Sequence, residues 1–400
     1  MRLLLAVATV VAVLLGPMHG SAVAQPARLE EAEPSGRVPP SPAFSAGFYL
    51  IPSFKFTEEF DDNIFASGTN KQWDFISRFS PGLEAGYRSE PFTLLVSGGF
   101  DSEVLARHPD LNEAVSGWHA GLTGLYLPIR PLTLGLTVAY VETHTTSTVP
   151  TSLAPAVILP ATVLQFGRVK ATFLAVSPSA EYRFTPTTAG STSYTYTHDT
   201  IETGVPTTAH TMRAGLSHDF TPIDKGILAY RTTIFESAGE TITDYVPTIG
   251  WVRQLTRATK LTLSGGPLFV SDGSVAPEVH ARLDHELPLA KLFLDYARSD
   301  SFVLGQAGVA KTETFAGGAD WEPIRFFHFI PTVTVTKLRG LTTGDTTLYD
   351  LSLMASYQIL RWLTARGGYR FLYQEQRGPD VPRNIVSLSL EVTYPYRYGQ

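Results

Sequence analysis

Strict alternation of apolar with small or polar residues is the feature of this 400-residue chain that most limits its fold. It recurs from about residue 46 to the end and is clearest in the segments 132–140 and 386–394, where Leu, Val and Tyr occupy every second position. Successive side chains of a β-strand point to opposite faces, so each segment has one apolar face and one small or polar face. The alternation predicts an all-β fold.

The alternating segments are too long for an ordinary soluble sheet. They run for about 10–14 residues, whereas soluble strands have about 5–6 and a tilted membrane-spanning strand needs about 9–11. Aromatic residues such as Tyr87, Phe92 and Trp251 gather at segment ends, where membrane interfaces place them. A soluble antiparallel sheet shares the local pattern, but closure in a membrane also removes exposed sheet edges. We therefore expect a single closed antiparallel transmembrane β-barrel over residues 46–400.

Short connections that contain proline or basic residues divide the barrel region into repeating units. They follow Tyr87, Leu127, Phe184, Phe220, Gln254, Leu287, Trp321 and Gln358. Neighbouring connections lie about 31–40 residues apart, with one gap of about 55, and a unit of that length holds two spanning strands and an outer loop. Eight short turns separate nine hairpins, which predicts about 18 strands with an error of one hairpin. Both ends of the barrel then lie on the short-turn side.

The N-terminus has the pattern of a targeting segment. Arg2 precedes an apolar run over 3–16 that closes on small residues at 21–24, which predicts a signal peptide over 1–24. Residues 25–45 are rich in proline and have no periodicity, so we expect a periplasmic tether. These features predict the outer membrane of a Gram-negative-type bacterium, with the tether, the short turns and the C-terminus in the periplasm.

Composition and motifs exclude several classes of function. The chain has no cysteine, which removes thiol catalysis and cysteine metal sites, and its net charge of −6 argues against binding nucleic acid. Hydrolase, zinc-protease and P-loop motifs are missing, and the adjacent pairs His198–Asp199, His218–Asp219 and Asp284–His285 point to opposite strand faces. Asp61–Asn63 could bind a cation through oxygen atoms but equally suits a turn. We expect no enzyme activity, no metal and no cofactor.

The alternation also predicts which side chains line the lumen. A charge that faces lipid at the midplane costs about 2–4 kcal/mol for Arg or Lys, so charged residues should occupy the face opposite the apolar one. The residues predicted to face inward are Lys55, Glu59, Glu84, Arg88, Asp101, Glu103, Lys170, Arg213, Arg231, Arg282, Asp284, Glu286, Asp295, Arg366, Arg370, Gln374 and Glu391. Each of these residues, taken alone, could simply stabilise the wall through an ion pair. Together they predict a water-filled interior. The apolar loop 149–163 either folds into this interior as a constriction or lies against the barrel rim or against lipid.

The end of the first strand carries a short motif, Phe60-Asp61-Asp62-Asn63-Ile64-Phe65. It resembles the N-terminal signature of a family of outer-membrane β-barrel proteins found at exopolysaccharide synthesis and export loci. The resemblance implies an 18-stranded polysaccharide conduit that works with a periplasmic polysaccharide export protein. The alternation of Tyr394, Tyr396 and Tyr398 is similar to the assembly signal of such barrels and implies the barrel assembly machinery as a partner, although Gly399 and Gln400 follow it.

Three functions fit these observations. The first is a passive conduit for a polysaccharide, whose mixed-charge, hydroxyl-rich wall would make weak contacts at many points. The second is a general or small-solute diffusion porin, which the same wall would serve. The third is a structural or adhesive surface barrel, against which the short outer loops argue.

Overall fold

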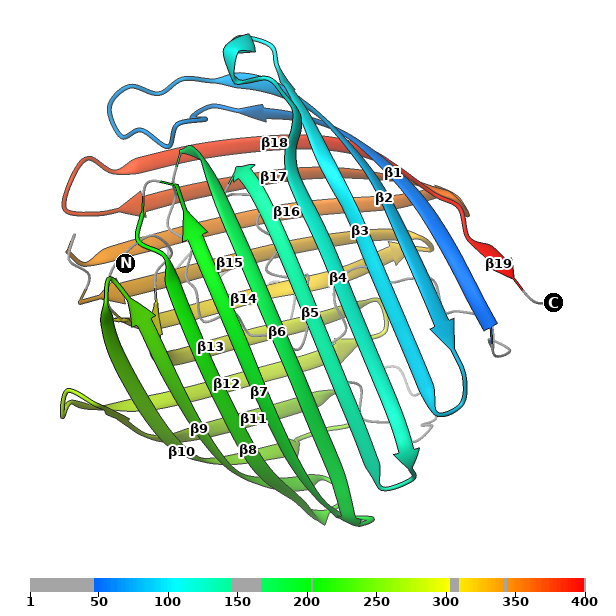
Figure 1. Ribbon diagram of the computed structural model, residues 1–400, viewed down its shortest axis with the longest axis vertical. Coiled ribbons are helices and arrows are strands. Elements are labelled where there is room, and N and C mark those ends of the chain that lie inside the picture. The colour runs from blue at the N-terminus through cyan, green and yellow to red at the C-terminus, as the bar shows by residue number, and fades with distance from the viewer. Residues whose placement is uncertain (1–46, 146–166, 203, 303–308, 341–343, 399–400) are drawn as a thin grey trace. The chain divides into compact units, whose positions relative to one another are not determined.

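The alternating segments form strands that pair side by side into one antiparallel sheet closed on itself (Figure 1). The computed structural model describes residues 47–145, 167–202, 204–302, 309–340 and 344–398. All of these residues belong to one of the two compact units of the chain, which spans residues 38–400. The predicted signal peptide, the tether and the loop 149–163 lie outside the described residues.

Apart from the three-residue β19, the strands run from 12 residues in β11 to 18 in β6, so several exceed the predicted length of about 10–14 residues and all of them exceed the span of a bilayer core. In chain order they are β1 (Gly47–Asp61), β2 (Asp74–Arg88), β3 (Phe92–Leu105), β4 (Glu113–Ile129), β5 (Leu132–Thr145), β6 (Arg168–Thr185), β7 (Thr188–Ile201), β8 (Thr207–Thr221), β9 (Asp224–Ser237), β10 (Glu240–Gln254), β11 (Thr259–Val270), β12 (Val275–Leu287), β13 (Ala290–Phe302), β14 (Val309–Ile324), β15 (Phe327–Arg339), β16 (Thr346–Leu360), β17 (Leu363–Glu375), β18 (Val381–Thr393) and β19 (Tyr396–Tyr398).

The first and last strands close the barrel. β1 pairs with β2 on one side and with β18 on the other, from Ser53 opposite Thr393 to Asp61 opposite Ile385. The short β19 follows a break after β18 and continues the same position in the wall beside the start of β1. The wall therefore has eighteen strand positions, which confirms the prediction.

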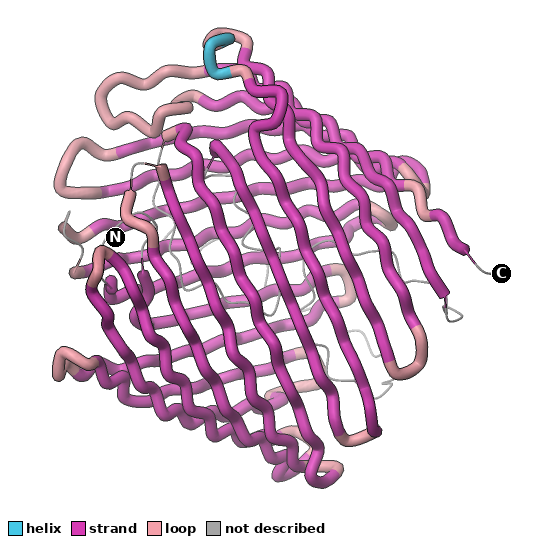
Figure 2. Tube along the Cα trace, in the orientation of Figure 1, coloured by secondary structure: helices cyan, strands magenta, loops and turns pink. Residues whose placement is uncertain are grey.

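Connections of two lengths separate the two ends of the barrel. At one end, which we call the short-turn end, eight turns of two to four residues join β2 to β3, β4 to β5 and so on to β16 and β17. The other end, the long-loop end, carries the remaining connections, most of which are longer although the β9–β10 turn has two residues, and a single described helical turn (Pro109–Leu111), visible in Figure 2. The eight short turns lie at the positions that the turn chemistry predicts. No helix within the described residues is long and apolar enough to cross a membrane.

Apolar side chains cover the outside of the wall. Phe48, Leu216 and Leu388 are exposed by 64%, 45% and 62% although they are large and apolar, which is the burial pattern of a surface that meets lipid rather than water. Aromatic rings line up on this face at the short-turn end. Phe48 contacts Tyr87 at 4.6 Å between ring centroids, and Tyr87 contacts Phe92 at 6.2 Å. This row is the interfacial aromatic belt that the sequence predicts.

One close approach in the wall requires a glycine. The β10–β11 pairing is interrupted between Tyr245 and Ile249, around Pro247, which has no N–H to donate. A Cβ atom on Gly266 would lie 1.8 Å from the carbonyl oxygen of Pro247. A side chain at this position would therefore push the two strands apart.

We expect Gly266→Ala to lower the free energy of unfolding by about 1–3 kcal/mol, the usual cost of overpacking. The measurement is urea unfolding of the barrel in detergent micelles. Gly367→Ala is the matched control, because a Cβ there would have no atom within 4 Å. Equal stability of the two variants would show that the β10–β11 contact is looser than described.

Candidate functional site: the inner wall of the barrel

Ion pairs that reach over intervening strands identify the inner face of the wall. The guanidinium of Arg231 on β9 donates to Glu278 on β12 at 2.5 Å, although β10 and β11 lie between them. Arg168 on β6 pairs with Glu103 on β3 across β4 and β5. Only side chains on the concave face of a curved sheet can meet over such a distance. Strict alternation then assigns every other residue of each strand to the lumen.

The register places almost every residue predicted to line the lumen on this inner face. These residues are Lys55, Glu59, Glu84, Arg88, Asp101, Glu103, Arg213, Arg231, Arg282, Asp284, Glu286, Asp295, Arg366, Arg370, Gln374 and Glu391. The alternation could predict their orientation because it is a property of each strand alone.

Lys170 is the exception. Thr143 lies opposite Ala171 but Thr145 lies opposite Arg168, so β6 has one extra residue in a β-bulge that contains Lys170. The bulge turns Arg168 inward. Lys170 lies next to the inward-facing Ala171 and shares the parity of Leu174, so it lies on the outer face, 46% exposed, where its ammonium group donates to Glu142 at 2.8 Å. The prediction of an inward Lys170 is therefore wrong.

A buried cluster of charges ties strands together at the inner wall. The guanidinium of Arg78 lies 2.7 Å from Glu103 and 3.7 Å from Glu59, and Arg168 contacts Glu103 from the other side. All four side chains are at most 11% exposed. These contacts join β1, β2, β3 and β6, so the cluster braces the wall from β1 to β6. Sequence reasoning did not find Arg78 or Arg168.

We expect Arg78→Met to lower the free energy of unfolding by about 3–5 kcal/mol, because it leaves the Glu59 carboxylate buried without a cation and removes one of the two cations that pair with Glu103. Urea unfolding in detergent micelles measures the loss. Lys170→Met is the control, since its exposed ion pair contributes at most about 1 kcal/mol. Losses of the same size in both variants would contradict a bracing role for Arg78.

Other inner-wall charges form smaller groups along the lumen. Arg366 pairs with Glu391, and Arg370 pairs with Asp350 through two nitrogen atoms, at 2.7 Å for the shortest contact. Arg282 lies 2.9 Å from Asp284. Arg213 differs from these residues, since no described side chain forms an ion pair with it and it is exposed. Both signs of charge therefore face the lumen.

The motif at the end of β1 fastens the seam where the barrel closes. Nε of Arg383 on β18 donates to both oxygens of Asp61, at 3.0 and 2.9 Å, and the two side chains are 3% and 0% exposed. Directly after the strand, the Asp62 carboxylate accepts from the backbone and side-chain nitrogens of Asn384 at 2.6 and 2.7 Å. Both aspartates thus bind residues more than 300 positions away in the chain.

The rest of the motif has structural contacts as well. The Asn63 amide nitrogen donates to the carbonyl oxygens of Ser67 and Pro382, so it joins its own loop to β18. Ile64 is buried against Ile76 and Leu105. The two aromatic residues of the motif contact neighbouring rings: Phe60 packs on Phe75 and Trp73, and Phe65 packs on His108. Contacts with β18 account for Asp61, Asp62 and Asn63, and packing against residues of β2, β3 and their flanking loops accounts for Phe60, Ile64 and Phe65.

Histidines that neighbour aspartates in the sequence do not form dyads with them. His198, His218 and His285 lie within 2.9 Å of the hydroxyl groups of Thr208, Thr188 and Thr259 on adjacent strands. Within the described residues, no three His, Asp or Glu side chains are grouped so that they could hold a metal ion.

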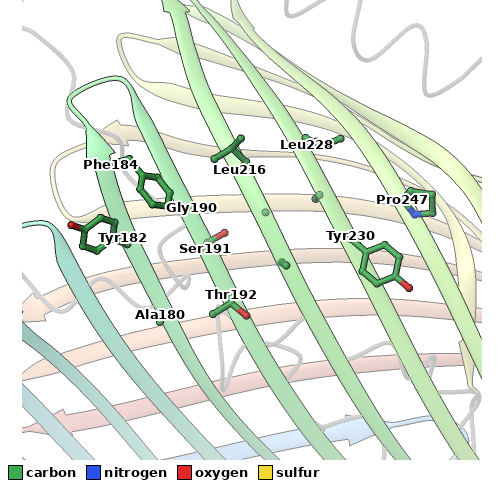
Figure 3. Close-up of a pocket in the computed structure, with 13 residues that line it drawn as sticks. Ala180, Tyr182, Phe184, Gly190, Ser191, Thr192, Leu216, Leu228, Tyr230 and Pro247 are labelled. Atoms are coloured by element: carbon green, nitrogen blue, oxygen red, sulfur yellow. The ribbon is translucent and has the colours of Figure 1, made fainter.

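A shallow groove of about 600 Å³ lies on the outside of the wall and is separate from the lumen. It crosses β6 to β10, and Tyr182, Phe184, Leu216 and Tyr230 surround small residues at its centre (Figure 3). Its lining is almost entirely apolar, and Leu216 and Tyr230 are both 45% exposed. The groove therefore belongs to the surface that meets lipid.

This chain matches no family model and no curated protein. Among solved structures it is similar to OccAB4 of Acinetobacter baumannii, with 8% identity, a TM-score of 0.49 and coverage of 88% of this chain and 98% of that one. It is also similar to the outer-membrane protein OpdK (10% identity, TM-score 0.49, 87% and 99% covered) and to OpdO (12% identity, TM-score 0.49, 87% and 97% covered), both of Pseudomonas aeruginosa. These figures give no ground for a functional assignment.

The fold and the inner wall by themselves define the class of protein. A closed antiparallel wall with an apolar exterior and a charged interior pairs each strand with a neighbour on both sides and leaves no open edge, as a bilayer demands. The protein is a transmembrane β-barrel.

Proposed function

We propose that this protein is an outer-membrane channel through which small hydrophilic solutes diffuse. The observation that carries the proposal is the closed wall of eighteen strand positions with charges of both signs on its inner face. A barrel of this size leaves room for an aqueous channel, whereas eight strands would be filled by their own side chains. Transmembrane barrels of this kind occur in outer membranes, which supports the predicted location.

Conductance tests this proposal directly. Purified protein in planar lipid bilayers is expected to open discrete ion-conducting steps, and liposomes that contain it are expected to swell in small neutral solutes. A barrel that inserts, as heat-modifiable mobility on gels would show, but neither conducts nor admits solutes would contradict the proposal.

Export of a polysaccharide is the second candidate, favoured by the resemblance of residues 60–65 to the signature of a family at exopolysaccharide loci. It would require a periplasmic polysaccharide export protein as a partner. The contacts of Asp61, Asp62 and Asn63 with β18 already account for that motif in structural terms. Deletion of the gene separates the candidates: loss of surface polysaccharide with unchanged solute uptake would favour export over the small-solute channel.

A further inference from the structure

Positively charged side chains gather on the outer face of β13, β14 and β15 at the long-loop end. The carboxylate of Glu313 lies 3.4 Å from Nη1 of Arg298 and 3.6 Å from Nη2 of Arg339. Lys337 lies directly opposite Glu313 in the register and is exposed. We call these four residues the basic rim patch. It spans two inter-strand spacings, which is about 10 Å.

The basic rim patch faces away from the lumen. The pairing of β14 with β13 and with β15 has no register shift between Lys311 and Gly318. Strict alternation therefore places Glu313 on the same face as Phe315, which is 40% exposed, whereas Thr312 on the opposite face is 7% exposed. The side chain of Arg339 is 52% exposed, so the patch is open to its surroundings.

The height of the patch along the wall matches the headgroup region of a membrane. About ten residues lie between the exposed rings of Phe315 and Phe326, which is the number that a tilted strand needs to cross the bilayer core. Glu313 lies two residues beyond Phe315, or about 7 Å further along the strand. Further on, Val309 packs against Phe235 and its neighbours on the inner wall, so β14 bends inward there and leaves the patch at the rim.

The charges of the patch are not balanced by the chain. Three cations share one carboxylate, and Arg339 lies directly opposite Lys311, an arrangement in which like charges repel. Lys311 has its own counterpart in Asp300, which lies opposite it on β13. On the outer face of β6, in contrast, Lys170 is balanced by Glu142. The excess of positive charge therefore indicates a negatively charged partner at the patch.

We propose that the basic rim patch binds the phosphate groups of lipopolysaccharide in the outer leaflet of the outer membrane. The proposal goes beyond the channel function and shares with it only the outer-membrane location, with the longer loops at the cell surface. Guanidinium groups match phosphate oxygens two at a time, and Lys337 adds a point charge. The exposed side chains of Phe315 and Leu294 continue the outer face below the patch, where acyl chains of the same lipid would contact them. A free phosphate ion would use only the charged part of this surface.

Lys337→Gln combined with Arg339→Gln tests the patch, because it leaves the ion pair of Arg298 with Glu313 in place. The folded protein is purified in detergent micelles, and binding of lipid A with both of its phosphates is measured by native mass spectrometry. We expect the double variant to bind lipid A about 25-fold more weakly, since each basic residue near an anionic lipid surface contributes a factor of about five. Lys170→Gln, on the same face at the same end of the wall, is the matched control and should bind like the unchanged protein.

Lipid A from which both phosphates have been removed should bind the unchanged protein as weakly as intact lipid A binds the double variant. Equal affinity of the double variant and the unchanged protein, or an equal loss in Lys170→Gln, would overturn the proposal. Displacement of lipid A by inorganic phosphate at equal concentration would overturn it too, since the site would then be one for the free ion.

Heat-modifiable mobility on gels shows whether each variant is folded. Lys337→Gln alone replaces the double variant if that protein does not fold, and it should weaken binding of lipid A about fivefold. Because the patch faces away from the lumen, conductance of the variants should equal that of the unchanged protein. The lipid site and the channel can therefore fail independently of each other.

Discussion

Arg383→Met is expected to lower the free energy of unfolding by about 3–5 kcal/mol, because it leaves the fully buried Asp61 carboxylate without its cation. The loss of stability falls on the seam between β1 and β18, where the end of the wall pairs with its beginning. The folded form should therefore convert to the unfolded, slower band at a lower temperature in semi-native gel electrophoresis. Urea unfolding in detergent micelles gives the size of the effect.

The control for this variant is Arg183→Met, whose ion pair with Glu181 is exposed and contributes at most about 1 kcal/mol. The double variant Asp61→Asn with Arg383→Met should recover part of the lost stability, since no buried charge then lacks a partner. If Arg383→Met unfolds like the unchanged protein, the ion pair does not hold the seam.

Cysteines introduced at Thr57 and Ser389 are expected to form a disulfide that locks the barrel shut. The two residues lie opposite each other across the seam and are both buried on the inner face. Because the cross-link closes a loop of more than 300 residues, it should stabilise the barrel by about 4–5 kcal/mol. Without reductant, the heated protein should keep an altered gel mobility that reductant abolishes.

The matched control moves the second cysteine by one residue, from position 389 to position 388. Leu388 is 62% exposed on the outer face, so Thr57→Cys combined with Leu388→Cys places the thiols on opposite sides of the wall. A one-residue change of register moves a whole strand face, which makes this pair of variants a sharp test of the closure. Equal cross-linking in both variants would contradict the described register between β1 and β18.

The sequence could predict much of the wall because its signals are local. Period-2 alternation and turn chemistry depend on neighbouring residues, so the strand count, the short turns and the facing of residues such as Arg366 and Glu391 follow from them. The prediction for Lys170 was wrong because it followed the charge of the residue, whereas the alternation of β6 gives Lys170 the outward parity of Leu174 and Val176. The β-bulge opposite Thr143 and Thr145 instead turns Arg168 inward, and nothing in the sequence signals that extra residue.

The sequence does not reveal which residues the inward side chains contact. The motif at residues 60–65 is visible in the sequence, but its contacts with Arg383 and Asn384 exist only because the last strand returns to the first. Arg383 could have been noticed as a charge on the inner face of an otherwise apolar strand start, between Val381 and Ile385. Its partner Asp61 could not have been predicted, because more than 300 residues of chain separate the two.

The sequence alone determined that the chain forms a barrel, with lipid on one face of each strand and the lumen on the other, since side-chain alternation and turns act over a few residues. Only the tertiary structure decided which charges brace the wall, how the seam is fastened, and that Arg298, Glu313 and Arg339 meet on the outer face. The physical reason is that pairing across strands depends on register and closure, which are set by the whole wall rather than by any one segment.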